Sequence, residues 1–415
     1  MWLLKATIRN VNRALKEVNA LELEGDYRPA TRQALKEILE GRMVNEVDTY
    51  LGRKWYERRD ENEVKDYRNG SYIRHLLTEL GDIDLKIPRT RHGFNSLILE
   101  AYKRRPKHID RLIMSSFILG MSTRKVALAL LAILGEKISP QLVSDVAKLL
   151  DDEVKRHHKR PLEDRYRFLY FDGIVLKHKG AAKVQKRIIL CAYGITYEKR
   201  REMIDFMLAS SESQNAWEGF LRNLYERGLK GESSELIITD GGKGLLAALE
   251  VIYPKIERQH CWAHKTRNVL DKVSKREHEK IRRDLHRISH AINRKEAVAA
   301  YWDFCAKYRN IYPKAVASLE ANIDELLTFY QFKLLLKEER TRSPEEIEIA
   351  QQALWRKIRT TNLIERAFVE VRRRTRPMGV FGNRTSMDRI LFAVFYHLNH
   401  KGQEEKSLFV FTQRS

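Results

Sequence analysis

Three acidic residues, Asp172, Asp240 and Glu365, lie in local sequence that predicts a carboxylate at the edge of a folded sheet. Asp172 stands inside an apolar run, residues 167–176, which predicts a central strand covered on both faces. An unpaired carboxylate is costly to bury in such a strand. We therefore expect Asp172 to be protonated, paired or bound to a cation.

Asp240 and Glu365 occupy two other kinds of position. Asp240 ends a short apolar strand, and the glycines after it predict a tight turn into a helix that begins near Gly244. Open α/β sheets usually place ligands at the carboxyl ends of their strands. Glu365 follows Asn362, a good N-cap, and borders the apolar stripe of a predicted helix. We expect Glu365 to project from the rim of the core.

Each acid also has a structural interpretation, which local spacing leaves open. Asp172 could be a buried ion-pair partner, Asp240 a turn former, and Glu365 the acid of a capping box with Asn362. The order strand-Asp, strand-Asp, helix-Glu is more informative than any one member. Three converging carboxylates repel one another unless divalent cations neutralise them, and such an oxygen-rich site suits Mg²⁺ or Mn²⁺.

These segments and several others resemble bacterial insertion-sequence transposases of the Mutator family. The resemblance covers most of the chain from about residue 65 to 395 and departs where many relatives have Ala in place of Gly173 and Gly241. The segments that carry it are Arg68-Asn69-Gly70, residues 81–89, Arg91-His92-Gly93, residues 120–126, Asp172-Gly173, Asp240-Gly241, residues 244–248, Cys261-Trp262-Ala263-His264, Thr361 to Arg366, and Arg372 to Arg376.

The resemblance implies a ribonuclease-H-like catalytic core with an Asp, Asp, Glu triad at Asp172, Asp240 and Glu365. We expect two-metal phosphoryl transfer, with Asp172 bridging two Mg²⁺ (or Mn²⁺) ions, Asp240 on one and Glu365 on the other. Hydrolysis would expose 3′-hydroxyls at the element's ends, and the same site would join them to target DNA. The family further implies recognition of terminal inverted repeats in double-stranded DNA, and synapsis by a homodimer or larger assembly.

Composition agrees with a nucleic-acid partner. The 415 residues include 78 Lys plus Arg against 56 Asp plus Glu, and the formal charge of +22 favours binding to a polyanion. RNA or an acidic membrane would fit this charge equally well. Three scattered cysteines are too few for a disulfide framework, which fits a reducing cytoplasm.

We expect no membrane partner. The longest apolar stretch, Val126 to Leu134, is too short to span a bilayer, and no hydrophobic signal segment precedes Lys5. These features predict a cytoplasmic, nucleoid-associated protein.

The pattern along the chain predicts an α/β protein with several parts. A mostly helical N-terminal region (1–100) contains an exposed strand at residues 82–87, which Pro88 ends. A helix-turn-helix-like DNA-binding region (101–164) follows. The ribonuclease-H-like, mixed-sheet catalytic core is formed by residues 165–264 and 356–400, a helical insertion (265–355) separates its two segments, and a C-terminal tail (401–415) ends the chain.

The helix-turn-helix prediction rests on two short helices, opened by Ser122-Thr123 and Ser139-Pro140 around Gly135. Arg124, Lys125 and Gln141 are the candidate DNA contacts there, although polar helix starts are common in all proteins. Basic clusters at residues 103–105 and 157–160 add to this prediction.

A second basic tract surrounds Glu365, with nine Lys or Arg and two Glu between Arg356 and Arg384. A solvated basic face is the simpler interpretation. We favour phosphate contact, because it would bring the DNA backbone to the third carboxylate. The candidates are Arg366, Arg372, Arg373, Arg374 and Arg376.

Cys261 and His264 suggest zinc, but a structural zinc site needs four ligands and no second Cys or His pair has suitable spacing. The resemblance instead implies that both residues support the active site, so we expect no zinc. Two other classes remain open: a transposase-derived DNA-binding regulator without catalysis, and a metal-dependent nuclease that cuts without joining.

Overall fold

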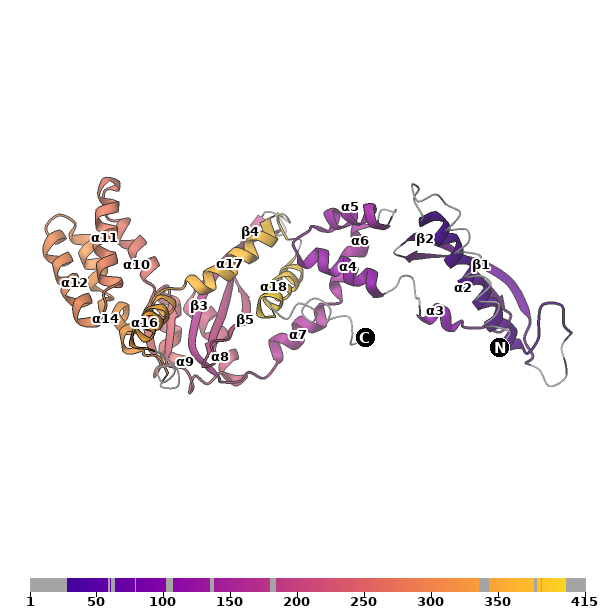
Figure 1. Cartoon of the computed structure of the whole chain (residues 1–415), viewed down its shortest axis with the longest axis horizontal. Helices are drawn as coiled ribbons and strands as arrows, with labels where there is room; N and C mark the ends of the chain where they lie inside the picture. The colour runs from indigo at the N-terminus through magenta and orange to yellow at the C-terminus, as the bar shows by residue number, and fades with distance from the viewer. Residues whose placement is uncertain are drawn as a thin grey trace. The chain divides into compact units, whose positions relative to one another are not determined.

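The computed structural model describes residues 28–58, 60, 64–78, 80–101, 107–134, 138–179, 184–335, 343–376, 379–381 and 383–400. These residues form two compact units, one ending at Leu149 and the other beginning at Leu150. The basic cluster at 103–105, the turn at Gly135 and the C-terminal tail lie outside the described residues. Figure 1 shows the elements in chain order.

The described residues of the first unit form one long helix, a two-stranded sheet and a set of shorter helices. Its elements are α2 (Arg28–Leu51), β1 (Arg68–Thr78), β2 (Gly81–Thr90), α3 (Leu97–Ala101), α4 (Lys107–Ile118), α5 (Thr123–Leu134) and α6 (Pro140–Lys148).

The strand at residues 82–87 differs from its prediction. It pairs antiparallel with β1, and it continues through Pro88 as part of β2. Ile83, Leu85 and Ile87 are buried in a core with Leu39 and Met43 of α2. Pro88 is tolerated because each strand of a two-stranded sheet has a free edge that needs no backbone donor. The sequence thus indicated one exposed strand at residues 82–87, whereas the structure has two paired strands, Arg68–Thr78 and Gly81–Thr90.

The second unit is built on a mixed α/β sheet. Its elements before the helical segment are α7 (Asp151–Lys159), β3 (Tyr166–Lys179), β4 (Val184–Thr196), β5 (Arg201–Ala209), α8 (Gln214–Glu226), β6 (Leu236–Thr239), α9 (Lys243–Ile252) and β7 (Glu257–His260).

The described sheet has five strands in the order β5-β4-β3-β6-β7, so β3 is central as predicted. β3, β4 and β5 form an antiparallel meander, whereas β6 runs parallel to β3 and β7 runs parallel to β6. Phe171 is in register with Thr239. This pairing places Asp172 and Asp240 one position further along neighbouring strands.

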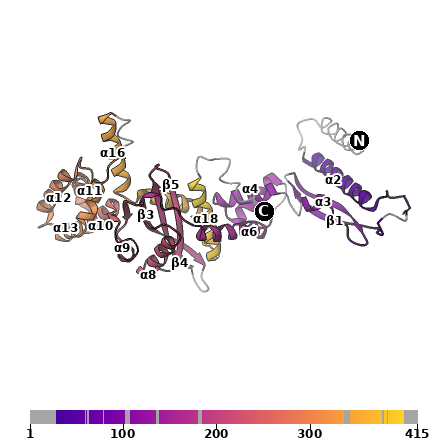
Figure 2. The ribbon, with the colours of Figure 1, turned by 90° about the horizontal axis from the view of Figure 1, so that it is seen from below.

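Helices cover both faces of the sheet. Leu169 and Phe171 of β3 pack into one core with α8 and α9, while α17 (Asn362–Thr375) lies against β3 and α18 (Arg384–Asn399) against β5. Figures 1 and 2 show α8 and α9 on one side of the sheet and α17 and α18 on the other. Side chains alternate along a strand, so Phe168, Tyr170 and Asp172 share the face toward α17.

A helical segment separates β7 from α17. It contains α10 (Trp262–Leu270), η1 (Lys275–Glu277), α11 (His278–Ser289), α12 (Arg294–Tyr308), α13 (Pro313–Glu320), α14 (Ile323–Leu327), η2 (Thr328–Gln331) and α16 (Pro344–Ile358), of which η1 and η2 are short 3₁₀ helices. Within the described residues, no helix has the length and apolar content needed to cross a bilayer.

Candidate active site

Asp172 is a buried acid in the middle of β3, only 8% exposed. Its Oδ1 accepts a hydrogen bond of 2.7 Å from the Gly173 amide. Burial raises the pKa of Asp172 to about 7, and the nearby charges of Asp240 and Glu365 act in the same direction, whereas the Gly173 amide and His264 oppose them. Within the described residues, no Lys or Arg forms an ion pair with Asp172, so the ion-pair interpretation finds no partner.

Asp240 follows β6 and also shapes the turn into α9. Its Oδ1 accepts a hydrogen bond of 2.9 Å from the Gly242 amide, as an Asp that forms a turn would. Gly241 has a φ of +83°, and a Cβ there would lie 1.8 Å from the His260 ring. The turn therefore depends on glycine. Asp240 can form the turn and also lie beside Asp172, because only one of its carboxylate oxygens accepts a hydrogen bond within the turn.

Glu365 lies in the first turn of α17, but it is not part of a capping box. The N-cap is Thr361 rather than Asn362, and no side chain caps the helix. Glu365 Oε1 instead lies 3.0 Å from the Thr361 hydroxyl and 3.8 Å from His264 Nε2. The predicted N-cap is therefore wrong by one residue, and the Glu365 carboxylate faces Thr361 and His264 rather than a backbone amide.

Cys261 and His264 lie beside Glu365, at the start of α10. Cys261 is buried, and its Sγ lies 3.3 Å from both the backbone N and the hydroxyl of Thr361. Thr361 Oγ1 is also 3.4 Å from His264 Nδ1. Thr361 is thus the shared neighbour of Cys261, His264 and Glu365, a role that no local pattern indicated.

The pKa values of Cys261 and His264 are shifted in opposite directions. Hydrogen bonding to Cys261 raises the pKa of His264 to about 9 against the effect of burial, and the charges of Asp172 and Glu365 add to the rise. Burial alone would raise the pKa of the Cys261 thiol, but hydrogen bonds from His264 and Thr361 lower it. A protonated His264 places a positive charge among the acids.

The three acids do not form a tight ligand cluster by themselves. Among the described residues, only His75, Asp82 and Asp84 bring three ligand atoms within 4.8 Å of one another. In that group, on the β1–β2 hairpin of the other unit, His75 and Asp84 are exposed and Asp82 is half-buried, and His75 Nδ1 bonds Asp84 directly. Exposed acids of this kind are common without a metal, so we attach no site to them.

The arginines of α17 divide by exposure. Arg366, Arg372, Arg373 and Arg376 are exposed, although Arg373 is 3.0 Å from Glu370. Arg374 is 4% exposed and bonds Glu370 as part of the core of the second unit. Arg374 therefore stabilises α17 inside the fold and is not part of the exposed basic surface of the helix.

The candidate DNA contacts of the first unit lie in the first turns of two helices. Arg124 and Lys125 are exposed in the first turn of α5, and Gln141 is exposed in the first turn of α6, where it donates a hydrogen bond of 2.9 Å to Asp145. Ser139 caps α6, as its sequence predicts, by accepting a bond from the Leu142 amide.

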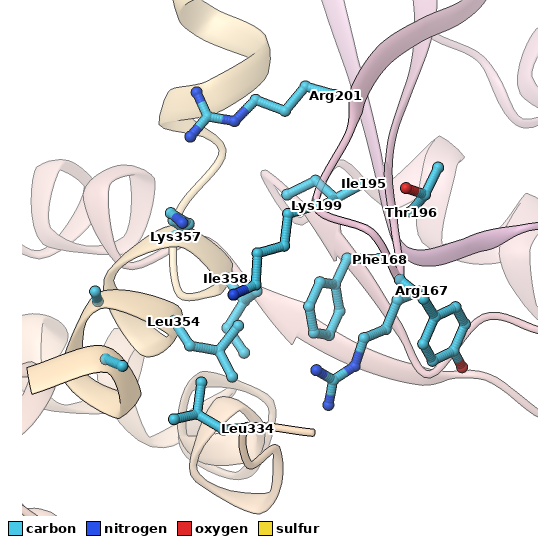
Figure 3. Close-up of a pocket in the computed structure, with 13 residues that line it drawn as sticks. Arg167, Phe168, Ile195, Thr196, Lys199, Arg201, Leu334, Leu354, Lys357 and Ile358 are labelled. Carbon is cyan, nitrogen blue, oxygen red and sulfur yellow. The ribbon is translucent and has the colours of Figure 1, made fainter. Parts of the chain in front are cut away.

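A separate hollow of about 170 Å³ lies between the sheet and α16 (Figure 3). Phe168, Leu334 and Leu354 contribute apolar surface, and Lys199 and Arg201 are among its basic residues. No carboxylate lines it, which distinguishes it chemically from the acidic site on the same face of β3.

The chain belongs to the Mutator family of transposases, whose family model matches residues 7–404. It is 32% identical over 381 residues to the transposase of insertion sequence IS905 from Lactococcus lactis, covering 92% of this chain and 90% of that protein. It is 30% identical to the ISRM5 transposase of Rhizobium meliloti, covering 93% of this chain and 90% of that protein. It is also 30% identical to the transposase of IS256 in transposon Tn4001 from Staphylococcus aureus, covering 86% and 87%.

Proposed function

We propose that this chain is a DNA transposase that binds the terminal inverted repeats of its insertion sequence, cleaves the ends and joins their 3′-hydroxyls to target DNA. The observation that supports the proposal is that the charges of two acids from other elements, Asp240 and Glu365, both act on the buried Asp172. Parallel pairing of β3 and β6 makes Asp172 and Asp240 neighbours, and the charge of Glu365 on α17 acts on Asp172. A purely structural role would not require three acids to converge.

The strand order supports a ribonuclease-H-like core. The described sheet begins with an antiparallel meander of three strands. A helical crossover then leads to parallel strands on the other side of β3. We propose with it the predicted domain boundaries, in which a helical insertion separates Asp240 from Glu365.

The residues present fit divalent cations. Asp172 is buried beside two other acids that raise its pKa, and a cation would relieve this repulsion. Asp172, Asp240 and Glu365 would hold two Mg²⁺ or Mn²⁺ ions. Such ions supply activation of the attacking water or 3′-hydroxyl and stabilisation of the leaving oxygen.

The surrounding residues would position the acids and the DNA. The Thr361 hydroxyl and His264 orient the Glu365 carboxylate, and Cys261 contacts the Thr361 hydroxyl. Exposed Arg366, Arg372 and Arg376 would contact the phosphate backbone near Glu365, with Arg373 less available because it pairs with Glu370. Arg124, Lys125 and Gln141 would contact the terminal repeats, and two ends would be held by a dimer or larger assembly.

The test compares wild type, Asp240→Asn and Asp271→Asn on labelled DNA carrying the ends that flank the gene, with and without Mg²⁺. Asp271 is an exposed acid at the end of α10 and serves as the matched control. We expect Mg²⁺-dependent cleavage and joining by wild type and Asp271→Asn, and binding without cleavage by Asp240→Asn. Binding without cleavage by all three would favour a regulator, cleavage without joining would favour a nuclease, and equal activity of all three would show that the triad is wrong.

A further inference from the structure

The hollow between the sheet and α16, which we call the α16 hollow, has a volume of about 170 Å³. Its floor is apolar: Phe168 of β3 is buried and directed into the hollow, and Leu334 and Leu354 line it from the helical segment (Figure 3). An engineered apolar cavity of about 150 Å³ is known to bind benzene. The α16 hollow therefore has the size for one planar ring and is too small for a base pair.

Basic side chains surround this apolar floor. Lys199, in the turn between β4 and β5, and Arg201, the first residue of β5, are exposed, and Lys357 of α16 is half-buried. A fourth, Arg167, pairs with Glu235 at 2.9 Å. Among the described residues that line the hollow there is no carboxylate. The hollow thus matches a ligand that combines a planar ring with an anionic group.

The backbone of the β4–β5 turn adds to this match. Lys199 has a φ of +65°, a left-handed conformation that glycine or asparagine adopts more easily than lysine. Strained residues of this kind tend to occur at binding sites, where the side chain has a use. Here the turn brings the Lys199 side chain to the margin of the α16 hollow.

Arg201 connects the α16 hollow to the proposed DNA contacts of α17. It also lines a second hollow, of about 450 Å³, between the sheet and helices α17 and α18, and Arg366, the residue after Glu365, lines that hollow as well. Phe168 and Asp172 stand four positions apart on the same face of β3, about 13 Å along the strand. A DNA strand at the acids therefore has a basic path, through Arg366 and Arg201, to the α16 hollow.

We propose that the α16 hollow binds the base of one unpaired nucleotide of the DNA strand, with Arg201 at its phosphate. The inference rests on the proposed function, because it assumes that DNA reaches the acids. Cations beside an aromatic or apolar surface are the usual means of binding single strands. Turning a base out of its pair costs least where the strand is already single. The competing interpretation is a gap in the packing between α16 and the sheet.

Binding of a fluorescein-labelled thymidine decamer to the full-length protein, followed by anisotropy in EDTA, tests the inference. Ala353→Met fills the hollow, and methionine is a good helix former for α16. We expect this variant to bind the decamer roughly 5- to 50-fold more weakly than wild type. If it binds like wild type, the hollow is a packing gap and the inference is wrong.

Arg201→Gln tests the charge at the hollow without filling it. We expect this variant to lower the slope of log affinity against log salt by about 0.7, the share of one phosphate contact on a single strand. Arg222→Gln is the matched control, because Arg222 is an exposed arginine of α8 on the other side of the sheet. Equal slopes for the two variants would contradict the inference.

Two further ligands show whether a base of a DNA strand is what binds. A decamer with the same backbone but no bases should bind wild type and Ala353→Met equally. A loss as large as with thymidine would contradict the inference, since the effect would not pass through a base. If thymidine monophosphate alone binds wild type as tightly as the decamer, the site takes a free nucleotide and the inference about DNA is wrong.

The assay contains no metal, so its result is separate from that of end joining. Failure here with Mg²⁺-dependent joining intact would refute the nucleotide site and leave the proposed function. A decamer bound through the hollow by a protein that joins no ends would refute the proposed function instead. Thermal unfolding checks the fold: we expect Ala353→Met to unfold at the wild-type temperature or higher, because it fills empty space.

Discussion

At the scale of single residues, Thr361 contacts Glu365, Cys261 and His264. Its hydroxyl is 3.0 Å from Glu365 Oε1 and 3.3 Å from Cys261 Sγ, and its side chain is fully buried. The hydroxyl therefore fixes the direction of the Glu365 carboxylate. Groups that orient a metal-binding carboxylate usually matter nearly as much as the carboxylate itself.

We predict that Thr361→Val lowers DNA joining roughly 10- to 100-fold, because it keeps the shape of the side chain and removes the hydroxyl. Thr361→Ser retains the hydroxyl and should stay close to wild type. Joining rates at saturating Mg²⁺, measured beside thermal unfolding, check the prediction. Equal rates for the Val and Ser variants would show that the hydroxyl does not orient Glu365.

Helix α7 is joined to the sheet by a buried charge cluster around Asp205 of β5. Asp205 is 1% exposed, and its Oδ1 lies 2.8 Å from His158 Nδ1. Arg227, after α8, bonds the other carboxylate oxygen, and His157 lies 3.6 Å from Oδ1. His157 and His158, which belong to the basic cluster at residues 157–160, are thus engaged within the fold.

We predict that Asp205→Asn destabilises the second unit by about 3–5 kcal/mol, since it leaves a buried cation without its partner. Burial would raise the pKa of Asp205, but His158, His157 and Arg227 lower it to about 2. A carboxyl with a depressed folded pKa stabilises the fold above its unfolded pKa of 3.8 and loses that contribution as pH falls toward 2. Urea unfolding between pH 7 and 3 should show a steeper loss below pH 4 for wild type than for Asp205→Asn; parallel curves would contradict the prediction.

Two glycines in neighbouring helices should respond oppositely to alanine. A methyl group at Gly219 of α8 would meet no atom within 4 Å, whereas one at Gly244 of α9 would meet the Glu212 backbone. We predict that Gly219→Ala stabilises by about 0.5–1 kcal/mol, because alanine is the better helix former. Gly244→Ala should destabilise by about 1–3 kcal/mol through overpacking. Denaturant midpoints check both, and stabilisation by Gly244→Ala would show that the backbone at Glu212 is not held against α9.

At the scale of elements, the sequence predicts what depends on local pattern. The strand around Asp172 and the strand directly before Asp240 are confirmed, because burial on both faces leaves a clear apolar signal. β7 was missed because its first two residues, Glu257 and Arg258, carry no strand pattern. Pro88 was misread because only the pairing partner shows that a strand can continue through it.

The site could be predicted only in part. Asp172 and Asp240 were recognisable as candidates because one stands inside an apolar strand and the other directly follows one. Thr361 was not, because its contact with Cys261 joins segments distant in sequence. The sequence does not distinguish Arg374 from its exposed neighbours, because its burial beside Glu370 depends on the packing of the fold.

At the scale of the whole molecule, the excess of 22 positive charges should make DNA binding strongly salt-dependent. We predict that Arg372→Gln weakens binding similarly on all DNA sequences and reduces the slope of log affinity against log salt by about 1. Arg276→Gln, an exposed control in η1, should leave the slope unchanged. Titrations between 50 and 300 mM salt, about the range in which such slopes are resolved, check this; equal slopes for wild type and Arg372→Gln would remove α17 from the phosphate contacts.

The central claim is that Asp172, Asp240 and Glu365 hold the divalent cations with which the protein cuts and joins DNA. The most direct measurement is strand joining by Asp240→Cys in Mg²⁺ and in Mn²⁺. Thiolate is a softer ligand that suits Mn²⁺ better than Mg²⁺. The account predicts joining lost in Mg²⁺ and partly restored in Mn²⁺, with Asp240→Asn inactive in both; Asp240→Cys equally active in both metals would contradict it.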